Sequence, residues 1–312
     1  MANRNTPRRR IRAIGEIILV LLGLLLIPIL PRAVVLGAAH ILGGLAFSFA
    51  RRDRRVTLAN LELAFGDTLS PDEMATLARA AFRSYALTML DIFWFAIFNR
   101  RRLARYVEFD PGTLERFSEA VITITAHYGN WEIMGQAVCG NGFRLVSVAK
   151  PIANPYLDRL LNHARARNGQ VVVPREGALR RLVKSIRSDK RNKVALLLDQ
   201  ETLPEDGGVF IDFFGVPTAI SRAAAELALR LELPLMVLFC HWDAGRGKYR
   251  IYGSPVFRGA PGESSVALTQ KIAGMVEAQI RAQPRHWLWM YKRWKHKLPG
   301  FPMERYPFYA DY

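Results

Sequence analysis

A histidine and a glutamate flank a short, turn-forming stretch near the middle of the chain, His127-Tyr-Gly-Asn-Trp-Glu132. Gly129 permits a sharp turn and Asn130 is a favoured N-cap, so the chain is expected to fold back there and bring the two side chains face to face. A carboxylate on one imidazole nitrogen fixes the tautomer, and the other nitrogen then takes a proton from a hydroxyl. The stretch therefore predicts the general-base half of an acyl-transfer site, although the spacing alone also fits a structural histidine.

The elements around this stretch alternate between strand-like and helix-like patterns. Continuous apolar runs, typical of strands buried on both faces, indicate a mostly parallel central sheet covered by helices, an α/β fold. Active sites of such sheets gather at the carboxyl ends of the strands, and His127 stands at the end of the first clear strand. The expected strands span 120–127, 143–150, 170–173, 193–199, 234–241 and 248–257, and the expected helices span 131–139, 155–168, 176–189 and 219–231.

The N-terminal region predicts a permanent membrane anchor. Residues 13–50 are almost entirely apolar, and a bilayer crossing needs about 20 such residues. Arginines flank the tract on both sides, so a re-entrant hairpin broken at Pro28 and Pro31 and a single span both remain open. We expect residues 1–50 to form a basic segment and anchor, and residues 51–312 to form one catalytic domain. Within that domain, Ser70-Pro-Asp-Glu73 predicts a capping box and a helix running to about Phe98.

The charge of the chain indicates acidic or anionic partners. The sequence has 44 Lys and Arg against 27 Asp and Glu, a formal net charge of +17. The C-terminal stretch 286–297 interleaves tryptophans with basic residues, which suits lipid headgroups and also suits nucleic acid, but the apolar anchor favours the membrane. Two cysteines exclude a disulfide scaffold. His241 could join His127, Glu132 and Asp199 in a metal-dependent hydrolase site, yet there is no HExxH motif, and we expect no metal.

Several blocks in this order resemble one enzyme family. Residues 126–132, AHYGNWE, are similar to the His-x4-Glu block of the late acyltransferases of lipid A biosynthesis, the lauroyl and myristoyl transferases within the wider lysophospholipid acyltransferase group. The resemblance extends over about residues 55–297. Its other blocks are NLELAF (60–65), KP with NPYLD (150–158), LDQ (198–200), GVF with FFG and Pro217 (208–217), and WLW with RWK (287–295).

The resemblance implies a bacterial inner-membrane enzyme whose active site faces the cytoplasm. Such enzymes move a fatty acyl chain from acidic acyl carrier protein to a hydroxyl of a phosphorylated lipid A precursor, with the carrier thioester as donor and no further cofactor. It implies His127 as the base and Glu132 as its orienting partner. The residues that it implies for substrate binding are Arg165 or Arg167, with no choice between them, together with Asp199, Asn130 and Lys150, the last replacing a common arginine. Acylation of another glycolipid, such as a mannosylated phosphatidylinositol, or of a lysophospholipid remains an alternative.

Overall fold

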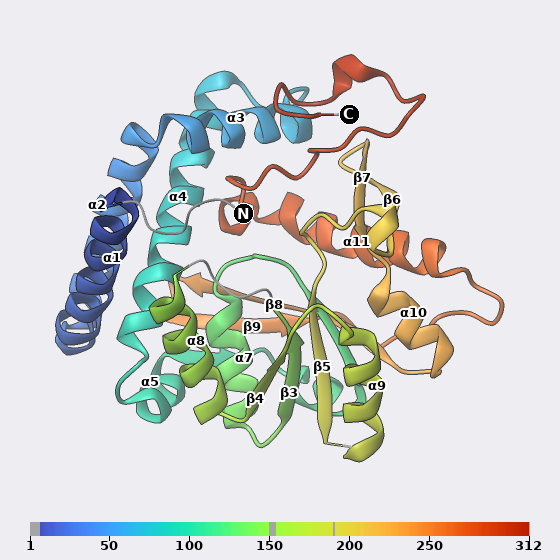
Figure 1. The fold of residues 1–312 in the computed structure, drawn as a ribbon, viewed down its shortest axis with the longest axis horizontal. Helices are drawn as coiled ribbons and strands as arrows, with labels where there is room; N and C mark the ends of the chain where they lie inside the picture. Colours follow the sequence, from blue (N-terminus) through green and yellow to red (C-terminus); the bar gives the residue numbers. More distant parts are fainter. Residues whose placement is uncertain (1–6, 150–153, 190, 312) are drawn as a thin grey trace.

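The computed structural model describes residues 7–149, 154–189 and 191–311 (Figure 1). A seven-stranded sheet forms its centre, with the strand order β1-β9-β8-β2-β5-β3-β4. All neighbouring strands run parallel except β8 and β9, so the expected α/β fold with a mostly parallel sheet is confirmed. The strands are β1 (Val107–Phe109), β2 (Ile122–Thr125), β3 (Arg144–Val148), β4 (Gln170–Val173), β5 (Asn192–Leu197), β8 (Leu235–Asp243) and β9 (Lys248–Gly253).

Hydrophobic clusters lie on both faces of the sheet, which explains the continuous apolar runs of the strands. Along β8, Leu235 and Val237 belong to one cluster and Met236 and Leu238 to the other, because successive side chains of a strand point to opposite faces. The helices that surround the sheet are α5 (Asn99–Tyr106), α6 (Thr113–Glu119), α7 (Trp131–Gly140), α8 (Pro155–Arg167), α9 (Ala178–Ser188), α10 (Ala223–Arg230) and α11 (Ser265–Ala282). Short 3-10 turns are η2 (Pro204–Asp206), η3 (Pro284–His286) and η4 (Met303–Arg305).

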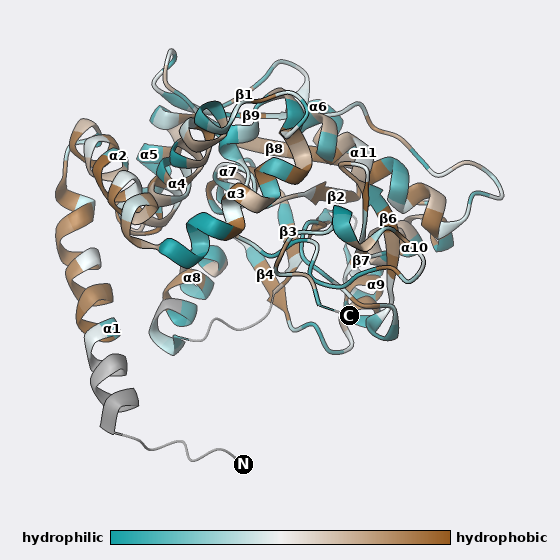
Figure 2. Cartoon of the chain, turned by 90° about the horizontal axis from the view of Figure 1, so that it is seen from above, coloured by the Kyte–Doolittle hydropathy of each residue, from teal (hydrophilic) through white to brown (hydrophobic). Residues whose placement is uncertain are grey.

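The N-terminal segment forms α1 (Pro7–Leu26), η1 (Ile27–Ile29), α2 (Arg32–Phe49) and α3 (Arg51–Phe65), followed by the long α4 (Pro71–Trp94). The apolar helix α2 packs along α4, and α1 extends away from the sheet, as Figure 2 shows. Within the described residues, α2 is the one helix long and apolar enough to cross a membrane. Large apolar side chains on α1, η1 and α2 stay exposed, among them Ile29 at 72% and Phe49 at 79%.

Two local expectations are met in detail. The Ser70 hydroxyl accepts the N–H of Glu73, and the Glu73 carboxylate accepts the N–H of Ser70 at 2.8 Å, which completes the capping box. Asn130 caps α7 by accepting the N–H of Ile133 at 3.0 Å. The helix that starts at Pro71 ends at Trp94 rather than near Phe98, and Phe98 itself adopts a left-handed backbone (φ 55°) before α5 begins.

One region differs from the expectation of a loop followed by a helix from residue 219. It forms an antiparallel hairpin of β6 (Gly208–Phe213) and β7 (Val216–Ser221), and α10 begins only at Ala223. The turn is Phe214-Gly215, where both residues have positive φ (57° and 75°), the geometry of a tight two-residue hairpin. The aromatic run through Phe213 and Phe214 obscures the alternating pattern that would have indicated these strands.

Candidate active site

The turn after β2 is pressed against the neighbouring strand β8. Gly129 has a positive φ of 54°, and a Cβ added there would lie 1.9 Å from the carbonyl oxygen of Cys240. The N–H of Asn130 donates to that same carbonyl at 3.0 Å, and the carbonyl of Gly129 accepts the hydroxyl of Thr88 at 2.8 Å. Only glycine fits this close approach, so the sequence fixes where the chain leaves the strand and thereby the position of His127.

Asp199 is the hydrogen-bond partner of the His127 imidazole. Imidazole Nδ1 lies 2.8 Å from Asp199 Oδ1, and the backbone N–H of His127 donates to Oδ2 at 2.8 Å. The indole of Trp287 donates to Oδ2 as well, also at 2.8 Å. Burial raises the pKa of this carboxyl, but the facing imidazole and the donated hydrogen bonds outweigh burial and hold the pKa below its ordinary value. The carboxylate is therefore ionised at neutral pH.

An ionised Asp199 determines which imidazole nitrogen carries the proton. A carboxylate only accepts hydrogen bonds, so Nδ1 must donate, and in the neutral ring Nε2 is then the nitrogen that carries no proton. Nε2 faces the side-chain nitrogen of Gln200 at 3.2 Å. Trp131 packs edge-on against the imidazole at a centroid distance of 4.7 Å.

The space at the imidazole is small. A cavity of about 10 Å³ is lined by His127, Ser84 and Trp287 among others, which is about the room that one water needs. The His127 side chain is 15% exposed. Gln200, whose amide lies next to Nε2, is itself exposed.

Glu132 makes a different contact from the expected one. Its carboxylate forms a bidentate ion pair with Arg165 of α8, with Nε–Oε2 at 3.0 Å and Nη2–Oε1 at 2.5 Å. Both side chains are largely buried, and a guanidinium neutralises a buried carboxylate better than a neutral imidazole does. Among the residues that the structure describes, no hydrogen bond joins His127 to Glu132, so this expected contact is not formed and Asp199 occupies the orienting position.

The two candidate arginines have different surroundings. Arg165 points to Glu132, whereas Arg167 lines a separate cavity between α5 and α8. Lys150 lies outside the described residues. His241 faces the Tyr252 hydroxyl at 3.1 Å and stacks on His286, and within the described chain no group of three or more His, Cys, Asp or Glu side chains is placed to hold a metal ion.

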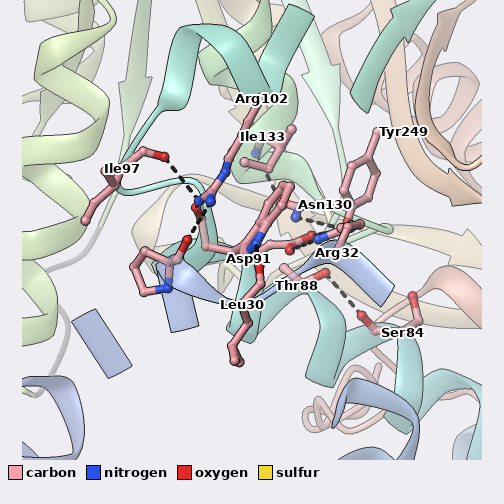
Figure 3. A network of polar contacts seen from close by, with 12 residues as sticks. Leu30, Arg32, Ser84, Thr88, Asp91, Ile97, Arg102, Asn130, Ile133 and Tyr249 are labelled. Atoms are coloured by element: carbon pink, nitrogen blue, oxygen red, sulfur yellow. Dashed lines mark hydrogen bonds and ion pairs between the residues drawn. The ribbon is translucent and has the colours of Figure 1, made fainter. Parts of the chain in front are cut away.

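A buried polar network connects the N-cap Asn130 to the N-terminal helices (Figure 3). The Asn130 amide donates to the Tyr249 hydroxyl at 3.3 Å, and that hydroxyl donates to Asp91 at 2.5 Å. Asp91 in turn pairs with Arg32, the first residue of α2. The Arg32 guanidinium lies 4.7 Å from the centre of the Trp94 ring, and Asp91 is fully buried. The sequence signal of this network is Arg32, a single cation within the apolar tract of residues 13–50.

The comparisons with known proteins identify the family. Residues 3–296 match the family described as bacterial lipid A biosynthesis acyltransferase, and the chain belongs to it. This confirms the resemblance and makes the protein an acyltransferase.

Relatives carry more than one specificity. The chain is 27% identical over 222 residues to the phosphatidylinositol mannoside acyltransferase of Mycobacterium tuberculosis (strain H37Rv), which covers 69% of each protein. It is 23% identical over 280 residues to the lipid A biosynthesis lauroyltransferase of Escherichia coli K12, which covers 88% of this chain and 89% of that protein. The crystal structure of the 1-acyl-sn-glycerophosphate acyltransferase of Thermotoga maritima aligns with 74% of this chain and 97% of that chain, at 14% identity and a TM-score of 0.36, too low to support a structural comparison.

Proposed function

We propose that this protein transfers a fatty acyl chain from acyl carrier protein to a hydroxyl of a lipid A precursor, with His127 as general base. The observation that supports this most strongly is the Asp199–His127 pair at the carboxyl ends of β5 and β2, because it holds Nδ1 as a donor and in the neutral ring makes Nε2 the proton acceptor. The family match over most of the chain gives the reaction class.

In the proposed reaction, Nε2 takes the proton of the acceptor hydroxyl while that oxygen attacks the thioester carbonyl carbon. The imidazolium that forms is stabilised by the Asp199 carboxylate, which remains ionised. Collapse of the tetrahedral intermediate breaks the C–S bond, and the imidazolium returns the proton to the leaving thiolate. The products are an ester and the free thiol of the carrier, so the balance requires no metal and no redox cofactor.

Glu132 and Arg165 are assigned a positioning role in this proposal. Their ion pair joins the first turn of α7 to α8 at the point where the His127 turn enters the helix. A bidentate guanidinium–carboxylate contact fixes both distance and orientation. The pair therefore holds the N-terminus of α7, whose backbone N–H groups are suited to a developing oxyanion, in a fixed place beside the turn.

The proposed location is the bacterial inner membrane, with the site facing the cytoplasm, where acyl carrier protein is found. The exposed apolar side chains of α1, η1 and α2 support membrane attachment, because soluble surfaces rarely leave such large contiguous apolar areas in water. The basic chain suits both anionic lipids and an acidic carrier protein. We propose no nucleic-acid partner.

A second acceptor class has specific support. The similarity to phosphatidylinositol mannoside acyltransferases makes a mannosylated phosphatidylinositol the alternative acceptor. The test is acyl transfer by the purified full-length protein from acyl-loaded carrier protein, offered a tetra-acylated lipid A precursor and a phosphatidylinositol mannoside in parallel, with products read by mass spectrometry. Ester formation on the lipid A precursor supports the proposal, ester formation on the mannoside alone selects the alternative, and no transfer to either overturns both.

A further inference from the structure

A second cavity lies between α5 and α8, away from the imidazole. Its volume is about 410 Å³, within the range of about 300–1,000 Å³ that is typical of small-molecule sites. One wall is the corner from Phe95 to Arg101, where α4 passes into α5, and the other is the face of α8 that carries His163 and Arg167. Figure 1 shows both helices at the same end of the sheet.

The corner that forms the first wall is firmly held. Arg102 donates to the carbonyl oxygens of Trp94 and Ile97, the latter at 3.2 Å, and reaches the carbonyl of Pro28 at 2.5 Å (Figure 3). Its guanidinium also stacks over the Trp94 ring at 4.0 Å. These contacts keep Phe98 in its left-handed backbone conformation, which a bulky residue adopts only where its surroundings impose it.

Two asparagines that line the cavity form hydrogen bonds to α7, the helix that carries Glu132. Asn99 of α5 and Asn168, which follows α8, both donate to the side-chain oxygen of Gln136, at 2.7 and 3.5 Å. Gln136 stands one helical turn after Glu132 on α7. The cavity, lined by the α4–α5 corner and by α8 with Asn168, is therefore connected through these two amides to α7, the helix that carries Glu132.

The charge of the cavity is entirely positive. Arg100, Arg101 and Arg167 line it and are exposed. Over residues 7–149, 154–189 and 191–311, no carboxylate lines the cavity and no ion pair engages these three arginines. Three unpaired guanidinium groups around one cavity repel each other. An anion with several acceptor oxygens would relieve this repulsion and accept their hydrogen bonds.

The cavity also lies at the margin of the apolar surface. Phe98 and Ile97 beside it are 60% and 44% exposed. At the other end of α8, Asn154 donates to Glu16 of α1 at 2.8 Å, which attaches α8 to the exposed apolar helix. A ligand in this cavity would therefore place its charged group against the arginines and its apolar part toward the lipid.

We propose that this cavity binds a phosphate ester of a substrate, with Arg100, Arg101 and Arg167 as its ligands. For the identity of the substrate this rests on the proposed function, which supplies two phosphate esters: the phosphorylated sugar of the acceptor lipid and the phosphopantetheine arm of the donor. The bidentate forks of the three arginines match phosphate oxygens, and the neighbouring aromatic and aliphatic side chains cover the apolar part of either molecule.

The test is direct binding by the full-length protein in neutral detergent, measured by 31P line broadening and by calorimetry. The probes are glucosamine 1-phosphate and 4′-phosphopantetheine, each compared with its unphosphorylated counterpart, glucosamine or pantetheine. We expect at least one phosphorylated probe to bind at least tenfold more tightly than its counterpart. The probe that does so identifies the source of the phosphate.

The decisive variant is R100Q/R101Q/R167Q, and the matched control is R180Q/R181Q/R187Q, which removes three exposed arginines from α9 at a distance from the cavity. We expect the first to lose the preference for phosphate and the control to keep it. If the triple variant does not fold, Arg167→Gln alone has to weaken binding at least threefold. Equal binding of phosphorylated and unphosphorylated probes, or undiminished binding by the folded variant, overturns the proposal, and neither result depends on acyl transfer.

Discussion

Asp199 accepts hydrogen bonds from both the backbone N–H and the imidazole Nδ1 of His127, each at 2.8 Å. The two hydrogen bonds hold both parts of His127, because one fixes the position of the main chain and the other fixes the orientation of the ring. The indole N–H of Trp287, in the C-terminal segment, donates a further hydrogen bond to the Asp199 carboxylate. The orientation of the candidate base therefore depends on contacts among His127, Asp199 and Trp287, which lie far apart in the sequence.

Replacing Asp199 with Asn removes the charge but keeps the size of the side chain. We expect kcat for acyl transfer to fall by about 10²–10⁴, because the imidazolium loses its stabilising carboxylate and the amide permits the wrong tautomer. Steady-state kinetics on the purified variant measures this. A variant that folds and turns over at the normal rate would show that Asp199 does not support the base.

The Glu132–Arg165 pair predicts non-additive effects on stability. Glu132→Ala leaves a largely buried guanidinium unpaired, and we expect it to lower the free energy of unfolding by about 3–5 kcal/mol. Arg165→Ala is expected to act similarly. The double variant should be more stable than either single one, as measured by unfolding in detergent, whereas additive losses would contradict a direct ionic pair.

The Arg32–Asp91 pair predicts a link between the N-terminal helices and the turn. Asp91→Ala strands the buried guanidinium of Arg32 and removes the acceptor of the Tyr249 hydroxyl. We expect a loss of about 3–5 kcal/mol in the free energy of unfolding. Asp53→Ala, an exposed change on the neighbouring α3, is the control and should alter stability by less than about 0.5 kcal/mol. Equal stabilities of the two variants would show that the Arg32–Asp91 pair does not stabilise the packing of α2.

Acid should destabilise the fold through two stacked histidines. Burial, together with nearby cationic groups such as Arg285, lowers the pKa of His241 to about 4 and that of His286 to about 3. Because the unfolded chain binds these protons near pH 6.5 and the folded chain does not, stability is full above about pH 6.5 and falls as the pH drops toward 4. The midpoint of thermal unfolding in detergent, followed from pH 8 to pH 4, measures the decline.

The control for that pH series is His241→Gln, which keeps a polar side chain beside Tyr252 but does not titrate. Its unfolding midpoint should fall less steeply between pH 6.5 and 4 than that of the unmodified protein. An identical slope would assign the acid sensitivity to other groups.

Local features of the fold could be predicted from the sequence because short-range patterns encode them. Buried strands such as 193–199 show continuous apolar runs, and the Ser70–Glu73 capping box is complete within four residues. The hairpin through Phe214 could not be predicted, because its aromatic run does not alternate between apolar and polar residues. In the structure Phe214 packs against Phe213 and Trp287.

The sequence placed His127 at the end of a buried strand, but it did not predict which side chain its imidazole contacts. The turn after a strand predicts His127, whereas Asp199 is implied by the family resemblance; the two side chains meet because the carboxyl ends of neighbouring parallel strands lie together. The expected partner Glu132 is close in sequence, but Arg165 competes for its carboxylate across 33 residues. Which of several nearby groups pair depends on charge and burial in three dimensions, and spacing along one chain does not contain that information. The roles of these residues in catalysis and binding stay predictions.

The most direct measurement is kcat for acyl transfer by the full-length His127→Ala variant, with His40→Ala on α2 as the control for removal of an exposed histidine. If His127 is the general base, its variant loses about 10²–10⁴ of the turnover while retaining the unfolding midpoint of the unmodified protein, and the control turns over normally. A folded His127→Ala variant with turnover within a factor of about two of normal would contradict that role.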